Sequence, residues 1–171
     1  MSERTAWGFG LATVTKHGDV LDAWFPQPSL GTPPDDVAAP TAIAELAGKD
    51  KVRKVTQAVV LVIADLDSPP ADTADAYLRL HLLSHRLVAP NSINLDGIFA
   101  ALPNVVWTTH GPCAVDGFEQ TRARLRAQGP VTVFGVDKFP RMVDYVVPSG
   151  VRIADADRVR LGAHLASGTT V

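Results

Sequence analysis

The sequence has little cysteine, little net charge and no long hydrophobic run, and each shortage excludes a class of protein. A single cysteine, Cys113, among 171 residues excludes an internal disulfide framework and fits a reducing compartment. The net charge of −2 gives no argument for nucleic-acid binding, and the basic runs 51–54 and 122–126 are typical of solvated faces. No apolar run reaches the length of a membrane span, and the N-terminus lacks the layout of a secretory signal. We therefore expect a cytoplasmic protein with no nucleic-acid or membrane partner.

What is present is the composition of an ordinary folded protein. Hydrophobic residues make up 46% of the chain and charged residues 20%. At 171 residues the chain can form one domain with a little left over.

The first part of the chain shows strand and helix patterns in alternation. The expected strands are 7–14, 19–25, 55–64 and 131–136, and the first two are joined by a hairpin turn. The expected helices are a short one at 41–47, a long one at 73–88 limited by Pro90, and one at 117–127. Asp116 and Glu119 have the spacing of a capping box at the start of the last helix. This order predicts a mixed α/β (α+β) domain with helices packed on a sheet.

The pattern changes to a period of six toward the C-terminus. Counting back in sixes from the last residue gives Val171, Leu165, Val159, Ile153 and Val147, all aliphatic. Every sixth side chain of a hexapeptide β-helix points into its core, and a turn of three hexads uses about eighteen residues. The sequence therefore predicts an N-terminal domain over 1–146, followed at 147–171 by barely more than one coil of a parallel β-helix.

Asp157 is the exception within this periodic segment. It occupies a slot that is filled elsewhere by Val151, Ala163 and Thr169. A carboxylate in a packed position is costly unless it is paired, protonated or bound to a cation. If such coils assembled around a symmetry axis, one acid from each copy could bind a hard divalent ion there. In the other interpretation the corner is exposed and Asp157 pairs with a neighbouring arginine, Arg158 or Arg160; both remain open.

Three further sets of residues could carry chemistry. His81 and His85 share a helix face, but zinc requires three or four protein ligands, which favours packing. A buried, inert thiol is the favoured interpretation of Cys113. Lys138 and Arg141, beside a rigid turn, could hold a dicarboxylate or could lie on a surface turn.

Three segments carry a resemblance to a known family. They are Tyr77–Val88 (YLRLHLLSHRLV), Asn104–Phe118 (NVVWTTHGPCAVDGF) and Val136–Val171 (VDKFPRMVDYVVPSGVRIADADRVRLGAHLASGTTV). Together with the opening hairpin (GLAT and VLDAWFP), they resemble the actinobacterial form of tetrahydrodipicolinate N-succinyltransferase. The match is weak across the proline-rich region 27–57.

The resemblance implies an α/β N-terminal domain, then a left-handed parallel β-helix, in a homotrimer. It implies succinyl transfer from succinyl-CoA, the cosubstrate, to the amino group of tetrahydrodipicolinate in diaminopimelate and lysine biosynthesis. It also implies a structural magnesium ion on the trimer axis, with Asp157 matching one of its ligands.

The chain departs from the family pattern because it ends before most of the β-helix. The family's catalytic glutamate and its CoA-binding coils would lie beyond Val171, so no catalytic residue is assigned within the chain and substrate contacts stay unassigned. We expect these 171 residues alone to be inactive. The alternative is a non-catalytic module whose last coil trimerises or docks on a partner through unpaired backbone groups.

Overall fold

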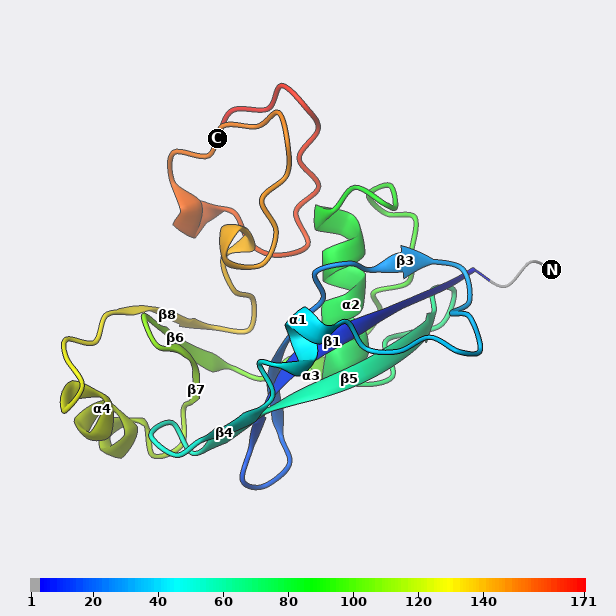
Figure 1. Ribbon diagram of the computed structural model, residues 1–171. Coiled ribbons are helices and arrows are strands. Elements are labelled where there is room, and N and C mark those ends of the chain that lie inside the picture. The colour runs from blue at the N-terminus through cyan, green and yellow to red at the C-terminus, as the bar shows by residue number, and fades with distance from the viewer. Residues whose placement is uncertain (1–3) are drawn as a thin grey trace.

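The computed structural model describes residues 4–171, and its largest element is an antiparallel sheet built on two long strands (Figure 1). The sheet consists of β1 (Thr5–Thr15), β2 (Val20–Trp24), β3 (Ser29–Leu30), β4 (Gly48–Asp50) and β5 (Val55–Asp65). β1 pairs along its whole length with β5, while β2 and β3 share its other edge. The expected hairpin and the strand at 55–64 are therefore confirmed, and the short helix expected at 41–47 is α1 (Thr41–Ala44).

One face of this sheet is covered by α2 (Thr73–Ser84), the central helix in Figure 1. The residues of β1 that point toward the helix are small: Ala6, Gly8, Gly10 and Ala12. The ring of Phe25 occupies the space that they leave, so close to Gly10 that an added Cβ would lie 2.6 Å from a ring carbon. Side-chain size along β1 thus determines how closely the helix layer approaches the sheet.

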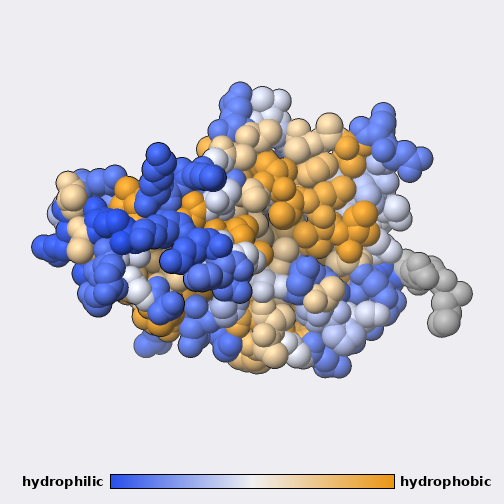
Figure 2. Space-filling view, turned by 90° about the horizontal axis from the view of Figure 1, so that it is seen from below, coloured by the Kyte–Doolittle hydropathy of each residue, from blue (hydrophilic) through white to orange (hydrophobic). Residues whose placement is uncertain are grey.

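The other face of the same sheet is apolar and partly open. Trp7 pairs across the ladder with Ile63, and Phe9 pairs with Leu61. Leu61 and Ile63 are both exposed, and Figure 2 shows apolar surface over this part of the molecule.

The long helix ends earlier than the sequence predicts. Pro90 was expected to limit it, but α2 stops at Ser84 because Arg86 adopts a left-handed backbone conformation with φ 62°. The amide N–H of Leu87 then donates to the carbonyl of Leu82, as in a Schellman motif. No glycine stands at this position to signal the end of the helix. The pattern of apolar residues therefore predicted an end that is too late.

A second, three-stranded sheet packs beside the first. Its strands are β6 (Val105–Thr108), β7 (Gly111–Ala114) and β8 (Val133–Asp137), in the order β7-β6-β8. β8 matches the strand expected at 131–136, whereas β6, β7 and the short helix α3 (Ile98–Ala101) were not predicted. α4 (Phe118–Arg126) packs on this sheet, at the left of Figure 1.

The capping box expected at the start of α4 is wrong. Its N-cap is Gly117, with φ 68° and no side-chain cap, rather than Asp116. Because Gly117 readily takes a positive φ, the chain turns one residue later than the capping pattern requires. Glu119 instead pairs with Arg122 on the exposed face.

The C-terminal segment contains two 3₁₀ turns, η1 (Met142–Asp144) and η2 (Ala156–Arg158), and two isolated bridges. One bridge is parallel and joins Arg152 to Thr170, eighteen residues apart. The segment rests on the C-terminal end of α2, where the Ser84 hydroxyl donates to the carbonyl of Ala163 at 3.0 Å.

The aliphatic residues at intervals of six in this segment differ in burial. Val159 is buried, and Ile153 and Leu165 are partly buried against the main core. Val147 is 78% exposed and Val171 is 40% exposed. The inward orientation expected for all five residues is therefore found only for Ile153, Val159 and Leu165, which pack against the main core.

Candidate functional site

A cleft of ≈ 500 Å³ lies between the two sheets. It is lined by residues of β1, β2 and β5 on one side and of β6, β7 and β8 on the other, with the η1 turn beside them. The lining includes four aromatic rings, which belong to Trp24, Trp107, Phe134 and Tyr145. Its size and its mixture of apolar walls with a few polar groups are typical of a small-molecule site.

Asp22 is the most unusual polar group in this cleft. It sits in β2 directly opposite Thr13 and is only 6% exposed. Its Oδ2 accepts a hydrogen bond of 2.5 Å from the Tyr145 hydroxyl, whereas its Oδ1 has no hydrogen-bond partner among residues 4–171. Burial raises the pKa of Asp22, although Thr13, Tyr145 and Arg53 act in the opposite direction. This oxygen is itself enclosed by the protein, so its unused hydrogen-bonding capacity is a cost to the folded state.

Two arginines also line the cleft, and both already have acidic partners. Arg53 donates to Asp50 at 2.7 Å and to the carbonyl of Pro112 at 2.9 Å. Arg141 donates to Asp144 at 3.0 Å, and its guanidinium lies 3.9 Å from the centroid of the Phe134 ring. The basic run 51–54 is therefore not simply a solvated face, because the Arg53 side chain is folded into the protein at 9% exposure.

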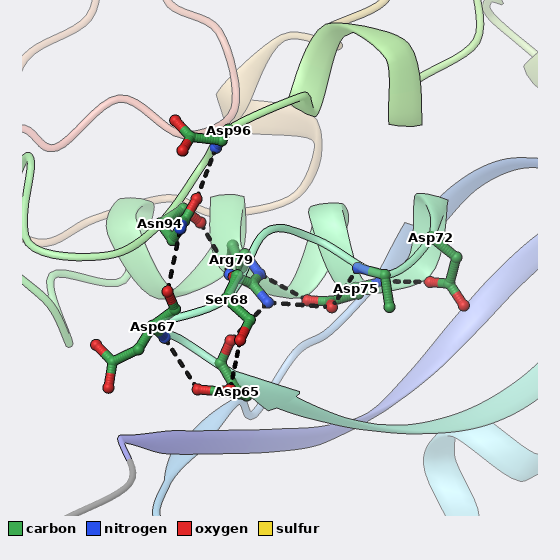
Figure 3. A network of polar contacts seen from close by, with 9 residues as sticks. Asp65, Asp67, Ser68, Asp72, Asp75, Arg79, Asn94 and Asp96 are labelled. Atoms are coloured by element: carbon green, nitrogen blue, oxygen red, sulfur yellow. Dashed lines mark hydrogen bonds and ion pairs between the residues drawn. The ribbon is translucent and has the colours of Figure 1, made fainter. Parts of the chain in front are cut away.

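A second buried polar cluster lies at the start of α2 and is shown in Figure 3. Asp75 accepts from Arg79 with both carboxylate oxygens, at 2.7 and 3.1 Å. The Arg79 guanidinium also donates to three backbone carbonyls, those of Asp65, Ser68 and Asn94. Since the guanidinium meets a partner on each of its nitrogens, the cluster fixes the loops around the helix and offers nothing to a ligand.

The helix histidines act as packing groups. His81 is fully buried: its Nε2 accepts from the backbone N–H of Phe25 at 3.2 Å, and its Nδ1 lies 2.6 Å from the carbonyl of Tyr77. This arrangement fits the neutral ring, and burial lowers the pKa of His81 to about 3. Among residues 4–171 no three His, Cys, Asp or Glu side chains are grouped so that they could hold a metal ion. The burial and hydrogen bonds of His81 agree with the packing interpretation of that residue.

The remaining candidates are separated from one another. Cys113 is fully buried, and burial raises the pKa of its thiol, as expected for an inert cysteine. Lys138 donates to the carbonyl of Leu102 at 2.6 Å, so it does not join Arg141 in a shared anion site. The proposed dicarboxylate pair is therefore not assembled by the fold.

Asp157 lies at an exposed corner in η2. Its carboxylate is 3.5 Å from the guanidinium of Arg141, and its backbone N–H donates to Asp155. The partner is thus neither Arg158 nor Arg160, the two arginines expected from the sequence, and Arg158 pairs with Asp155 instead. An exposed carboxylate oxygen is the type of ligand that magnesium prefers, but one such group is far short of a complete site.

Sequence reasoning missed the cleft because its residues come from six separate strands. The one local signal was Asp22, an acid in the middle of the apolar strand VLDAW with buried neighbours on both sides. Arg53, Gln57, Trp107 and Tyr145 carry no such signal, since only the packing of the two sheets brings them together.

The fold is similar to that of a protein whose structure has been solved. The chain matches the crystal structure of a tetrahydropyridine-2-carboxylate N-succinyltransferase from Campylobacter jejuni with a TM-score of 0.73, at 24% identity, over 99% of this chain and 57% of that one. This likeness shows a mixed, strand-rich domain with few helices.

Sequence comparisons point to the same family. Residues 102–141 match the description "Tetrahydrodipicolinate N-succinyltransferase middle". The chain is 56% identical to the 2,3,4,5-tetrahydropyridine-2,6-dicarboxylate N-succinyltransferase of Salinispora tropica, over 98% of this chain and 56% of that protein. It is 41% identical to the Vibrio cholerae enzyme of the same name, over 96% of this chain and 58% of that protein. The chain is thus related to the tetrahydrodipicolinate N-succinyltransferases, as its sequence segments indicated, and spans a little over half the length of these relatives.

Within the described residues 4–171, no helix combines the length and the apolar character that crossing a lipid bilayer requires.

Proposed function

We propose that this chain is part of an acyltransferase subunit that moves succinyl from succinyl-CoA to the amino group of tetrahydrodipicolinate in diaminopimelate and lysine biosynthesis. The observation that carries the proposal is the 56% identity, sustained over 98% of the chain, with a relative bearing that activity in its name. The strand-rich fold shared with the Campylobacter jejuni enzyme supports it.

The proposal includes a division of labour within the subunit. Residues 1–146 form the globular α/β domain, and residues 147–171 form the first coil of a left-handed parallel β-helix. The parallel bridge between Arg152 and Thr170 supports the second part, because eighteen residues are about one turn of three hexads. Acyl transfer from a thioester needs a positioned amine and donors for the developing oxyanion, and we place both in coils outside this sequence.

Asp157 is the residue that we propose as a magnesium ligand in a homotrimer. Its carboxylate is exposed, so copies of the chain could present it to a shared axis, and the bound ion would neutralise the repulsion between the converging acids. Arg141 is the group that competes with the ion for this carboxylate.

Release of CoA is the measurement that tests the activity. The polypeptide that carries this sequence in the cell should release CoA from succinyl-CoA when tetrahydrodipicolinate is present, and should release little when the amine is omitted. The 171-residue chain expressed by itself should release none above that background. Failure of the first assay would overturn the proposed reaction, and turnover in the second would overturn the placement of the catalytic groups.

Mass measurement in solution separates the proposal from the interaction module. A concentration-independent trimer formed by the 171-residue chain alone, with or without magnesium, would favour the module. A monomer under the same conditions would favour the enzyme part, whose trimer contacts and axial ion require further coils.

A further inference from the structure

The outer edge of the large sheet is formed by β5, and most of it has no neighbouring strand (Figure 1). β1 pairs with β5 along its whole length on one side, whereas β4 occupies the other side only beside Val55–Gln57. Beyond that point, residues 58–64 make no backbone hydrogen bond to any part of residues 4–171 other than β1. We call this stretch, with the sequence AVVLVIA, the β5 edge.

The register shows which residues of the β5 edge present their backbone outward. The N–H of Leu66 donates to the carbonyl of Arg4, so these two residues form a hydrogen-bonded pair at the end of the ladder. Such pairs alternate with non-bonded pairs along an antiparallel ladder. Counting back from Leu66, the N–H and C=O groups of Val59, Leu61 and Ile63 therefore point away from β1.

The β5 edge is also apolar and unprotected. Leu61 is 44% exposed and Ile63 is 54% exposed, and Figure 2 shows apolar surface over this part of the molecule. Natural sheets protect their edges with lysine, proline or bulges. Residues 58–64 contain no charged residue and no proline, and their pairing with β1 has no shift of register. An edge of this kind is a template for a further strand.

A second copy of the same strand fits this template. If two copies meet antiparallel around a two-fold axis at Leu61, Leu61 lies opposite its own copy and Val59 lies opposite Ile63 of the partner subunit. All the outward-facing residues then form hydrogen-bonded pairs, in which both residues exchange N–H···O bonds. The paired stretch ends before β4 begins beside Gln57. Because the strands run in opposite directions, the Asp65 carboxylates lie at opposite ends of the pair and do not repel each other.

We propose that the β5 edge binds the β5 edge of a second copy, so that two large sheets join into one antiparallel sheet across a two-fold axis. Such an interface is complementary to itself by symmetry, and its apolar side chains lie side by side on one face. The contact lies outside the coil at 147–171, so it is separate from the contacts of the proposed homotrimer. It obeys mass action and therefore depends on concentration, unlike the concentration-independent trimer of the interaction module.

Leu61→Lys tests the pairing, because it places two ammonium groups opposite each other at the two-fold axis. A lysine at an exposed sheet edge is compatible with the fold of a single chain. Sedimentation of the polypeptide that carries this sequence in the cell should show the mass of the parent doubling as concentration rises, while the variant keeps the lower mass. Leu30→Lys makes the same change at a 52% exposed leucine of β3, on the other side of β1, and should behave like the parent.

Leu61→Cys tests the register. Opposite residues of a hydrogen-bonded pair have Cα atoms about 5.5 Å apart, which is within the range that a disulfide spans. Oxidation should therefore link two copies of this variant about tenfold faster than two copies of Leu30→Cys, whose side chains do not meet. The native Cys113 is buried and takes no part in the linkage.

Hydrogen exchange in the unaltered protein distinguishes a second copy from any other occupant of the edge. Pairing between copies predicts that the amides of Val59, Leu61 and Ile63 exchange slowly at high concentration and faster on dilution. Protection at every concentration without a doubled mass would mean that another part of the same subunit covers the edge. Fast exchange at every concentration would mean that the edge stays unpaired, and equal doubling in the parent and Leu61→Lys would place the contact elsewhere. Each of these three outcomes overturns the proposal.

Discussion

The start of α2 and the cleft between the sheets both bury an aspartate, but they surround it differently. Asp75 accepts from Arg79 with both oxygens, and Arg79 extends the contact to three backbone carbonyls. The Asp22 carboxylate accepts from the Tyr145 hydroxyl, and its enclosed Oδ1 has no hydrogen-bond partner among residues 4–171. A buried charge stabilises a fold only when its partners are complete, so the first aspartate supports the architecture, whereas the second is buried at a cost in stability.

The largest effect is expected from breaking the complete cluster. Arg79→Met keeps the apolar stem but leaves the Asp75 carboxylate and three carbonyls without their donor. Removing one partner of a buried ion pair costs about 3–5 kcal/mol in the free energy of unfolding. Urea denaturation followed by circular dichroism measures the loss.

The control for this prediction is the exposed ion pair on α4. Arg122→Met removes the partner of Glu119 on the protein surface, where solvent screens the charges, so the midpoint of unfolding should hardly move. Similar losses in the two variants would show that completeness of the buried cluster is not what stabilises this region.

A smaller but pH-dependent effect is expected at His81, which is buried in its neutral form on the same helix. The unfolded chain binds a proton at this residue near pH 6.5, whereas burial lowers the pKa in the folded chain to about 3. Acidification between these values therefore favours unfolding, by about 1.4 kcal/mol for each pH unit. His85, whose pKa is also lowered by burial, acts in the same direction.

His81→Gln isolates this contribution, because a glutamine oxygen can still accept from the Phe25 backbone but cannot be protonated. The free energy of unfolding, measured in urea at pH 6.5 and pH 4.5, should fall by about 2 kcal/mol more in the parent protein than in the variant. The same pH dependence in both proteins would place the titrating group elsewhere.

The comparison also explains how much could be predicted from the sequence. The long strands and α2 were predicted because their side chains repeat at strand or helix periods, as in β1, where small residues alternate with larger ones. The early end of α2 was missed, since it depends on a left-handed Arg86 that no local pattern indicates. β6 and β7 were not predicted either: each has only four residues, and a proline, Pro112, lies within β7.

The candidate sites divide in the same way. Burial of Cys113 and His81 could be expected from residue type and periodicity. The cleft could not, because Asp22 and Tyr145 are 123 residues apart and meet only through the packing of β2 against the η1 turn. Asp157 was singled out by the period of six, and its role in metal binding stays a prediction.

The smallest expected effect is the loss of folding stability caused by burying the ionised Asp22 carboxylate with few compensating partners. Burial raises the pKa of this carboxyl above the ordinary value of 3.8, so the folded state disfavours the ionised form. The resulting penalty is absent below pH 3.8, grows as pH rises through the interval up to the raised pKa, and is constant above it. Asp22→Asn removes the titration and should therefore gain stability relative to the parent as pH rises from 3.8 to 7. Urea midpoints of the two proteins across this range measure the difference.

If the variant instead lost stability relative to the parent with rising pH, the Asp22 carboxylate would have to be fully compensated in the folded protein, and its contrast with Asp75 would disappear.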